Sequence, residues 1–455
     1  MRAVALLAVL CACVGCGATK VSTVVACAAD GTCPAGSHCE AGLCQSGDPV
    51  DAVAGDGAGP VGGDTSADTG GFCLADLSGG PSPRGESFGG FADGRFFAIS
   101  GDEGIAVNCN PAPKPVANGW SFTPCVGWSS VGADAPDPRA RAASVGDGSG
   151  KLYVFGGRYR TAASGNYTLH NDTWEWSKAA GWKQLDDGKT GGPKARSSTV
   201  LGVDPTTGVL WLHGGNASNN GLAFTPLADV WFYDPAAGFW QVATTTGKAP
   251  SARIMHAGAV TRDGKWLVVF GGGDANAFQG PFFQDTWRLE LATGAWSQIA
   301  KSGAKPAARI LGSMVASGGS KVLLFGGHDD GAVGNRNDIW ELDVEAGKWT
   351  VLRDGDLGQG GNPNVVNKQP NAACDFPADF MQLDMDSPER RESALFAWDE
   401  VGQKAWLFGG KSDCGALRDV WTFDPVEAKW KVIDDTPKGW SCSRYVNPCT
   451  QLCGG

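Results

Sequence analysis

Short apolar runs separated by polar turns recur along the chain, and residues 253–300 show the unit most clearly. Its second run, 266–270, is continuously apolar, as expected for a strand buried on both faces. The turn before it, 262–265, contains Asp-Gly, which readily adopts positive φ. The unit therefore predicts a four-stranded antiparallel meander, with strands at 254–261, 266–270, 286–291 and 296–300.

Marker residues repeat with this unit. A Gly-Gly pair ends the second strand, an Asp-x-Trp follows, and a second Trp comes about nine residues later. Neighbouring copies are 53 to 58 residues apart, except for 81 to 83 residues before the last copy. Such a period indicates units that bury their apolar faces only by stacking on copies of themselves. The five clear copies contain Gly156-Gly157, Asp172, Trp174 and Trp182; Gly214-Gly215, Asp229, Trp231 and Trp240; Gly271-Gly272, Asp285, Trp287 and Trp296; Gly326-Gly327, Asp338, Trp340 and Trp349; and Gly409-Gly410, Asp419, Trp421 and Trp430.

A degraded sixth copy, with Ser100-Gly101, Trp120 and Trp128, precedes the other five. Six copies predict an all-β, six-bladed propeller, in which twisted sheets pack face to face around an axis. We expect the Trp side chains between blades, where each buries ~150–250 Å² and contributes at most roughly 4–6 kcal/mol. We expect the paired glycines where a Cβ would obstruct a close approach of backbone.

The Gly-Gly after strand two and the two spaced aromatics resemble the kelch repeat family, within the galactose-oxidase-like central domain superfamily, over about residues 82–433. The resemblance implies a six-bladed kelch-type β-propeller. The first copy departs from the family pattern, because Ser100-Gly101 replaces Gly-Gly and Asn118-Gly119-Trp120 replaces the Asp-x-Trp. The first blade is therefore expected to differ from the others.

Residues 1–16 have the features of a lipoprotein signal peptide: Arg2, an apolar run at 3–10, and cysteines preceded by small residues. Cys13 and Cys16 compete as the lipidated residue, and cysteine parity favours Cys16 because twelve cysteines then remain. A cleaved secretory signal without a lipid is the alternative, and the run is short for a transmembrane span. The lipoprotein interpretation predicts a bacterial cell-envelope protein, located at the outer membrane.

Two further segments are predicted before the propeller. Residues 17–44 contain four closely spaced cysteines among Gly and Pro, which predicts a small knot with two disulfides because an exported chain meets an oxidising compartment. A zinc site that includes His38 is the alternative. Residues 45–72 are rich in Gly, Ala and Asp without aromatics, which predicts a flexible linker. The knot cysteines are Cys27, Cys33, Cys39 and Cys44.

Eight other cysteines lie in the predicted propeller domain, 73–455, which includes a Cys-rich tail. Cys109 and Cys125 flank an insertion in the first blade, and Cys374 and Cys414 fall in loops of one face. We expect Cys73 to bond one of the three tail cysteines, which would close the ring, and the other two to pair. The tail cysteines are Cys442, Cys449 and Cys453.

One face of the propeller is expected to carry the functional surface. The turns between strands one and two and between three and four are short, whereas the loops between strands two and three are long and varied. A Pro-x-x-Arg opens each blade on this varied face. These arginines predict a positive channel mouth for anions, or alternatively structural partners for the repeated aspartates. They are Arg84, Arg141, Arg196, Arg253, Arg309 and Arg391.

Candidate chemistry beyond these arginines is sparse. The kelch-type fold is also that of copper radical oxidases and of a sialic acid isomerase, so the resemblance makes an enzyme one alternative. A copper site of that kind needs grouped His and Tyr, whereas the five His and five Tyr of this chain are scattered. Glu392 and Asp379 are acid/base candidates by location only, and His328-Asp329-Asp330 is a loop cluster that could help to hold a hard cation. His213 and His256 lie in or near predicted strands, and we expect each to be a packed or a solvated histidine.

The chain carries 37 Lys and Arg against 48 Asp and Glu, a net charge of −11, without a basic cluster, which disfavours nucleic acid. The sequence therefore predicts a monomeric, lipid-anchored, non-catalytic binding module for a protein or envelope glycan, without a cofactor. The alternatives are a secreted carbohydrate-active or copper-radical enzyme on the same fold and a purely structural envelope component.

Overall fold

The computed structural model describes residues 37–40, 43–46 and 79–434, the last range without residues 105, 108–109, 112–114, 132–135, 163–164, 222, 277–278, 330–333, 356–385 and 413–414. The chain divides into two compact units, Met1–Gly70 and Gly71–Gly455. In the first unit, β1 (Ser37–Glu40) and β2 (Leu43–Ser46) form an antiparallel hairpin in which Cys39 is opposite Cys44. Cys27, Cys33, the signal peptide and most of the predicted linker lie outside the described residues.

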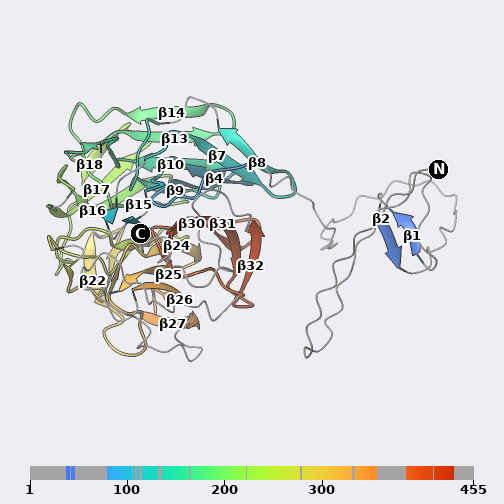
Figure 1. The fold of residues 1–455 in the computed structure, drawn as a ribbon. Helices are drawn as coiled ribbons and strands as arrows, with labels where there is room; N and C mark the ends of the chain where they lie inside the picture. Colours follow the sequence, from blue (N-terminus) through green and yellow to red (C-terminus); the bar gives the residue numbers. More distant parts are fainter. Residues whose placement is uncertain are drawn as a thin grey trace, which may run out of the picture. The chain divides into compact units, whose positions relative to one another are not determined.

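The second unit contains six antiparallel sheets of consecutive strands, one for each sequence copy, and they confirm the six-bladed propeller (Figure 1). Blade 1 comprises β3 (Phe88–Ala92), β4 (Arg95–Ile99), β7 (Gly119–Thr123) and β8 (Gly127–Val131). Blade 2 comprises β9 (Ala143–Gly146), β10 (Lys151–Phe155), β13 (Thr173–Ser177) and β14 (Gly181–Asp186). Blade 3 comprises β15 (Val200–Val203), β16 (Leu210–Asn216), β17 (Pro226–Asp234) and β18 (Phe239–Val242). Blade 4 comprises β19 (Ala257–Val260), β20 (Trp266–Phe270), β21 (Thr286–Glu290) and β22 (Ala295–Ile299).

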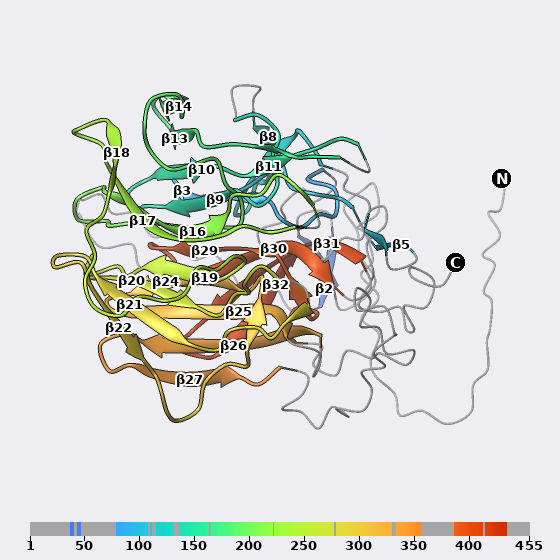
Figure 2. The ribbon, with the colours of Figure 1, turned by 90° about the vertical axis from the view of Figure 1, so that its left-hand side faces the viewer.

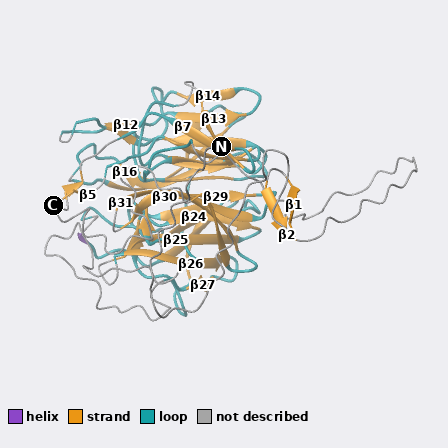
Figure 3. Cartoon of the chain, turned by 45° about the vertical axis from the view of Figure 1, so that its right-hand side comes forward, coloured by secondary structure: helices purple, strands orange, loops and turns teal. Residues whose placement is uncertain are grey.

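The innermost strand is divided in two in the last two blades. Blade 5 comprises β23 (Arg309–Ile310), β24 (Ser313–Gly318), β25 (Lys321–Asp329), β26 (Asn335–Asp343) and β27 (Lys348–Arg353). Blade 6 comprises β28 (Arg391–Glu392), β29 (Leu395–Asp399), β30 (Lys404–Ser412), β31 (Gly415–Asp424) and β32 (Lys429–Asp434). Short hairpins β5 (Ala106–Val107) with β6 (Asn110–Pro111) and β11 (Arg158–Tyr159) with β12 (Thr168–Leu169) extend from loops of the first two blades. The described part of this unit consists almost entirely of strands and loops (Figure 3).

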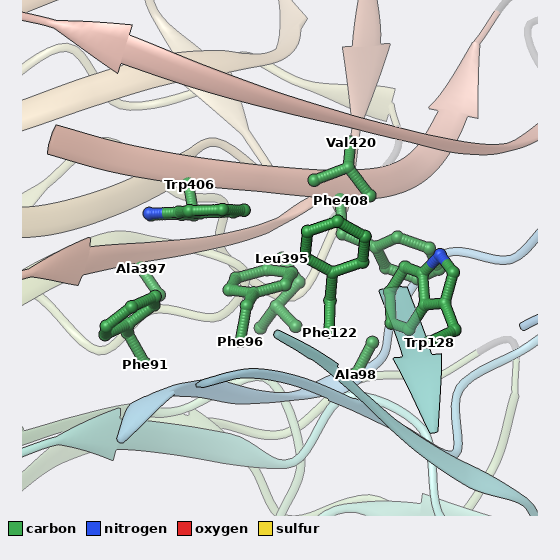
Figure 4. Close-up of a cluster of buried hydrophobic side chains, with 10 residues drawn as sticks. All are labelled: Phe91, Phe96, Ala98, Phe122, Trp128, Leu395, Ala397, Trp406, Phe408 and Val420. Atoms are coloured by element: carbon green, nitrogen blue, oxygen red, sulfur yellow. The ribbon is translucent and has the colours of Figure 1, made fainter. Parts of the chain in front are cut away.

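Each of the six blade interfaces has its own apolar cluster, so the packing that closes the ring is like the packing within it. At the closing interface, between blades 6 and 1, the rings of Phe96, Phe122 and Trp128 face Trp406 and Phe408 (Figure 4). The predicted position of the second Trp is confirmed in five copies, because Trp128, Trp240, Trp296, Trp349 and Trp430 are all buried. In blade 2, Trp182 is only partly buried, and it packs against the cluster between blades 1 and 2.

The Gly-Gly pairs lie where one blade meets the next. The first glycine has a φ between 58° and 66°, and a Cβ on it would come within 2.5–3.2 Å of the carbonyl oxygen of the next blade's arginine. In four of these pairs the N–H of the second glycine donates to that same oxygen, as between Gly157 and Arg196 at 2.9 Å. The expected close approach of backbone is thus confirmed. In blade 1, Ser100 takes the first position at φ 52° and donates its hydroxyl to the Val116 carbonyl.

A closed ring of six backbone hydrogen bonds encircles the propeller axis at the end where the innermost strands begin. In each blade the residue two positions after the buried arginine of its opening turn has a φ of 53–59°, and its N–H donates to the corresponding carbonyl of the preceding blade at 2.8–3.3 Å. The last bond, from Glu86 N–H to the Ser393 carbonyl, joins blade 1 to blade 6. The six residues are Glu86, Arg141, Ser198, Met255, Leu311 and Ser393, and we call them the mouth ring.

Below the mouth ring, the innermost strands enclose a channel cavity of about 160 Å³. In Figure 2 the innermost strands β3, β9, β19, β24 and β29 lie at the middle of the unit, with β14 and β27 at its outer edges. At the far end Arg262 lines the cavity, and its guanidinium lies 3.4 Å from both the Gly146 carbonyl and a Glu400 carboxylate oxygen. The mouth ring and Arg262 therefore mark the two ends of the channel.

Cysteine pairing is described at one position only. Cys125, in the turn between β7 and β8, is disulfide-bonded. Cys73, Cys109, Cys374, Cys414 and the three tail cysteines lie outside the described residues, so the predicted covalent closure of the ring stays a prediction. The described contacts close the ring without it, through the mouth ring, the apolar cluster and a hydrogen bond from Trp128 Nε1 to Asp434 at 3.0 Å.

Candidate functional site: the channel mouth

The repeated arginines are structural in five blades. Arg196 is fully buried, and its guanidinium donates to the Gly214 carbonyl and to both carboxylate oxygens of Asp229 at 2.6 and 2.8 Å. That carboxylate also accepts the indole N–H of Trp231 at 2.7 Å. Burial would raise the pKa of Asp229, but hydrogen bonds from Arg196 lower it below its usual value. The same arginine–aspartate–tryptophan unit recurs as Arg139–Asp172–Trp174, Arg253–Asp285–Trp287, Arg309–Asp338–Trp340 and Arg391–Asp419–Trp421.

These contacts correct the predicted anion site. Arg84, Arg196, Arg253, Arg309 and Arg391 are at most 2% exposed, and their donors are directed to groups of their own blade. The structural alternative therefore holds for them. In blade 1 the Asn118 amide oxygen replaces the carboxylate and accepts from Arg84 at 2.7 Å. Burial lowers the pKa of Arg84 to about 10.

Arg141 does not belong to this set. In blade 2 the structural position is held by Arg139, which follows Pro136 in a second Pro-x-x-Arg that overlaps Pro138-x-x-Arg141. The sequence offers a signal for the correct choice, because Arg139 lies 33 residues before Asp172 and Arg196 lies 33 residues before Asp229. Arg141 instead belongs to the mouth ring, where its guanidinium pairs with the carboxylate of Glu86 in blade 1.

Three cations converge on the buried carboxylate of Glu86. Arg141 approaches it at 2.8 Å, and Arg158 and Lys411 each at 3.5 Å. Burial alone would raise the pKa of Glu86, but Arg141, Lys411 and Arg158 hold it well below its usual range. Lys411 also reaches Asp102 at 3.1 Å. This charged cluster joins blades 6, 1 and 2, and sequence reasoning missed it because its members are far apart in the chain.

Two more side chains extend the charged cluster outward. The guanidinium groups of Arg158 and Arg160 lie over the ring of Tyr167, 4.3 and 4.1 Å from its centroid. Tyr167 is on the loop between β11 and β12, and its N–H donates to the Asn219 carbonyl of the next blade. The tyrosine therefore holds two arginines side by side at the rim.

The opposite side of the mouth is apolar. Met255 and Leu311 of the mouth ring pack with Phe282 and with Phe224, both from loops between strands two and three. Met255 and Phe282 are buried, whereas Phe224 and Leu311 are partly exposed. The varied loops thus give the mouth a charged side at blades 6, 1 and 2 and an apolar side at blades 3 to 5.

Glu392 lies at the boundary between these two sides. It follows the structural Arg391 in β28, is partly buried, and is opposite Lys411 in the register with β30. Burial raises the pKa of Glu392, although His328, Arg141 and Lys411 act in the opposite direction. Its role as an acid/base candidate stays a prediction, and Asp379 lies outside the described residues.

The histidines are mostly engaged in packing. His213 and His256 are buried and share a hydrogen bond of 3.0 Å between Nδ1 and Nε2 across blades 3 and 4. Burial lowers the pKa of His213 to about 3 and that of His256 well below its usual value, so both rings are neutral at pH 7. In the predicted cation cluster, Asp329 instead pairs with Arg336 at 2.6 Å and His328 contacts Asn335.

No group of three or more His, Cys, Asp or Glu that could hold a metal occurs among the described residues. Within the same part of the chain, the structure contains no helix that is long and apolar enough to cross a bilayer.

Comparison with known proteins agrees with the geometry. The family model for the KLHDC2/KLHL20/DRC7 Kelch-repeats domain matches residues 119–327 and 207–363, which together cover more than half of the 455 residues. The chain belongs to the kelch-repeat family. The matched residues run from β7 to beyond β27 and therefore include blades 2 to 5, the part of the ring with the regular Gly-Gly and Asp-x-Trp pattern.

Individual relatives match about half of this chain. Multiple epidermal growth factor-like domains protein 8 of Rattus norvegicus is 31% identical over 251 residues, 51% of this chain and 8% of that protein. Acyl-CoA-binding domain-containing protein 4 of Arabidopsis thaliana is 26% identical over 49% of this chain and 32% of its own length. Kelch domain-containing protein 10 of Xenopus tropicalis is 26% identical over 46% of this chain and 60% of its own length. This kelch chain therefore spans less than two thirds of each of these relatives.

Proposed function

We propose that this kelch protein is a non-catalytic binding module of the bacterial cell envelope, anchored by a lipid on Cys16, that holds a protein partner over its channel mouth. The observation that carries the proposal is the two-sided mouth: a charged cluster around Glu86 next to an apolar surface around Met255 and Leu311. An amphipathic segment of a protein matches such a surface, because apolar contacts supply binding energy and charged groups fix orientation.

The mouth favours a protein over a glycan. Sugar rings bind well on open aromatic faces, but the Tyr167 ring is covered by two guanidinium groups, and Phe282 is buried with its ring edge-on to His328. The turns of the opposite face are short, and blades 2 to 5 follow one regular plan there. The proposed partner therefore binds at the face with varied loops.

The test is partner capture from native membranes. Purified wild type is compared with Leu311→Asp, which places a charge in the apolar side of the mouth, and with Val401→Asp, a matched change at a 95% exposed position in the β29–β30 turn on the opposite face. We expect a protein captured by wild type and Val401→Asp to be lost from Leu311→Asp. A partner retained by Leu311→Asp, or a glycan captured in place of a protein, contradicts the proposal.

Acylation is tested separately. Cys16→Ser is expected to release the protein from the membrane fraction and to abolish metabolic labelling with a fatty acid. Labelling retained by Cys16→Ser but lost from Cys13→Ser would place the anchor at Cys13.

A further inference from the structure

Blade 1 combines two departures from the arginine–aspartate–tryptophan unit at one dipeptide. Asn118 stands where the other blades have aspartate, and it is followed by Gly119. Asn118 is exposed and lies directly before β7, so that water reaches its side-chain amide. Glycine has no Cβ, and its main-chain nitrogen is therefore open to reaction with the preceding side chain. The five aspartates are each followed instead by a β-branched residue, which shields that nitrogen: Thr173, Val230, Thr286, Ile339 and Val420.

The amide of Asn118 makes only half of the contacts of the aspartate that it replaces. Its oxygen accepts from Nη1 of Arg84 at 2.7 Å, whereas Nη2 of Arg84 donates to the Ser82 hydroxyl. In the complete units a second carboxylate oxygen accepts from both the arginine Nη2 and the indole N–H. An amide nitrogen cannot accept, and the buried Nε1 of Trp120 has no acceptor among the described residues. A carboxylate at position 118 would therefore supply the missing acceptor.

We propose that Asn118 is a site of spontaneous deamidation, which converts it to aspartate and completes the sixth arginine–aspartate–tryptophan unit. The main-chain nitrogen of Gly119 attacks Cγ of Asn118, a five-membered cyclic imide forms, and the amide nitrogen leaves as ammonia. Water then opens the imide. The sum of the two steps is asparagine plus water to aspartate plus ammonia, so the reaction needs neither an oxidant nor a cofactor.

Arg84 is placed to act on both steps. Attack on Cγ moves negative charge onto the amide oxygen, and the buried guanidinium that already donates to this oxygen stabilises the charge as it develops. Opening of the imide to aspartate gives a carboxylate that can bind both Arg84 and Trp120, and it keeps the main-chain carbonyl of Asn118, which accepts the Ser100 N–H at 2.9 Å. Opening to isoaspartate adds a carbon to the main chain at the start of β7 and displaces this bond. We therefore expect aspartate to be the main product.

Peptide mapping of the full chain, freshly purified and after incubation in the folded state at pH 7, tests the proposal. The peptide that contains Asn118 should gain one mass unit, and it should incorporate one heavy oxygen atom when the water is enriched in the heavy isotope. Each conversion adds one negative charge, so an acidic form should accumulate on ion exchange. Gly119→Ala is the matched control, because its Cβ would lie 3.2–3.4 Å from Ile99 and Val131, which a small shift accommodates. The added methyl group should slow the conversion.

A second Asn-Gly dipeptide, Asn220-Gly221, gives a comparison within the same sample. Asn220 is exposed on the loop between β16 and β17, where we expect the imide to open to both aspartate and isoaspartate. Fragmentation by electron transfer distinguishes the two isomers. A larger share of aspartate at position 118 than at position 220 is the readout of the role of Arg84.

Stability gives a further readout, because the product is the same chain as the variant Asn118→Asp. The urea midpoint of wild type should move toward that of Asn118→Asp as the protein ages, and that of Gly119→Ala should move less. Absence of conversion in folded wild type, equal rates in wild type and Gly119→Ala, or the same share of isoaspartate at positions 118 and 220 would each overturn the inference. None of these results depends on capture of a partner, so the inference and the proposed function can fail separately.

Discussion

Blade 1 offers a direct test of what the arginine–aspartate–tryptophan unit contributes to stability. In the other blades the carboxylate accepts the indole N–H at 2.6–2.9 Å. In blade 1, Asn118 replaces the aspartate, and the buried Nε1 of Trp120 has no acceptor among the described residues. The change Asn118→Asp restores an acceptor for Trp120 and places a negative charge beside the buried Arg84.

The expected gain follows from two terms. A buried donor without a partner costs about 1–3 kcal/mol, and the new acceptor removes that cost. Asn118 is exposed, so solvent screening limits the contribution of the new ion pair to roughly 0–1 kcal/mol. We therefore expect Asn118→Asp to raise the free energy of unfolding by about 1–3 kcal/mol, or Tm by several degrees.

Urea denaturation at constant pH and salt measures this difference, and a double-mutant cycle assigns it. In a Trp120→Phe background the indole N–H is absent, so the gain from Asn118→Asp should fall to the screened ion-pair contribution. Asn118→Ala is the control that removes the acceptor for Arg84 and should destabilise the protein. If Asn118→Asp raised the free energy of unfolding equally in the wild-type and Trp120→Phe backgrounds, or did not raise it in the wild-type background, the reasoning would be refuted.

Three further outcomes are expected. Asp338→Asn leaves the nearly fully buried Arg309 without its counter-charge and should destabilise the protein by about 3–5 kcal/mol at pH 7. Since Arg309 lowers the pKa of Asp338 in the folded state, this stability is present above the unfolded pKa of about 3.9 and is lost as the pH falls. The stabilities of wild type and variant should therefore converge at lower pH in acid denaturation. Gly271→Ala brings a Cβ within 2.7 Å of a backbone oxygen and should lower the free energy of unfolding by at least about 2 kcal/mol in urea titration. The control is Gly238→Ala, because Gly238 has a comparable φ but open space around it, and its loss should be much smaller. Similar losses in both variants would show that the close approach of the two backbones at Gly271 is unimportant. Trp349→Ala should cost about 3–5 kcal/mol in the same assay, and a loss below 1 kcal/mol would contradict the placement of this indole between blades 4 and 5.

Most of the fold could be predicted because each repeat carries the same marker residues at the same spacing. Gly-Gly, Asp-x-Trp and the second Trp have contacts that recur from blade to blade, so their spacing alone identifies the blades. The predicted strand 254–261 begins three residues too early, since β19 starts at Ala257. The reason is Met255, whose φ of 56° interrupts the strand to form the mouth ring, and no glycine signals that conformation in the sequence.

The candidate site was harder to predict, since it depends on which blades meet. Glu86, Arg158 and Lys411 come from blades 1, 2 and 6 and contact one another only because the ring closes. Their sequence context does not differ from that of solvent-exposed charges. The Pro-x-x-Arg pattern predicts Arg141 at a repeat position that Arg139 occupies, and the ring of backbone hydrogen bonds places Arg141 at the mouth.

In the mouth ring, the main chain holds the blades together, and the side chains are left to determine the chemistry of the channel mouth. Its bonds use only main-chain atoms, and the residues that make them include a carboxylate, a guanidinium, two hydroxyls, a thioether and a branched alkyl chain. Because the same main-chain geometry accepts such different chemistry, a combinatorial library randomised at the partly exposed Ser198, Leu311 and Ser393 should retain the scaffold, whereas the buried Glu86 and Met255 are kept.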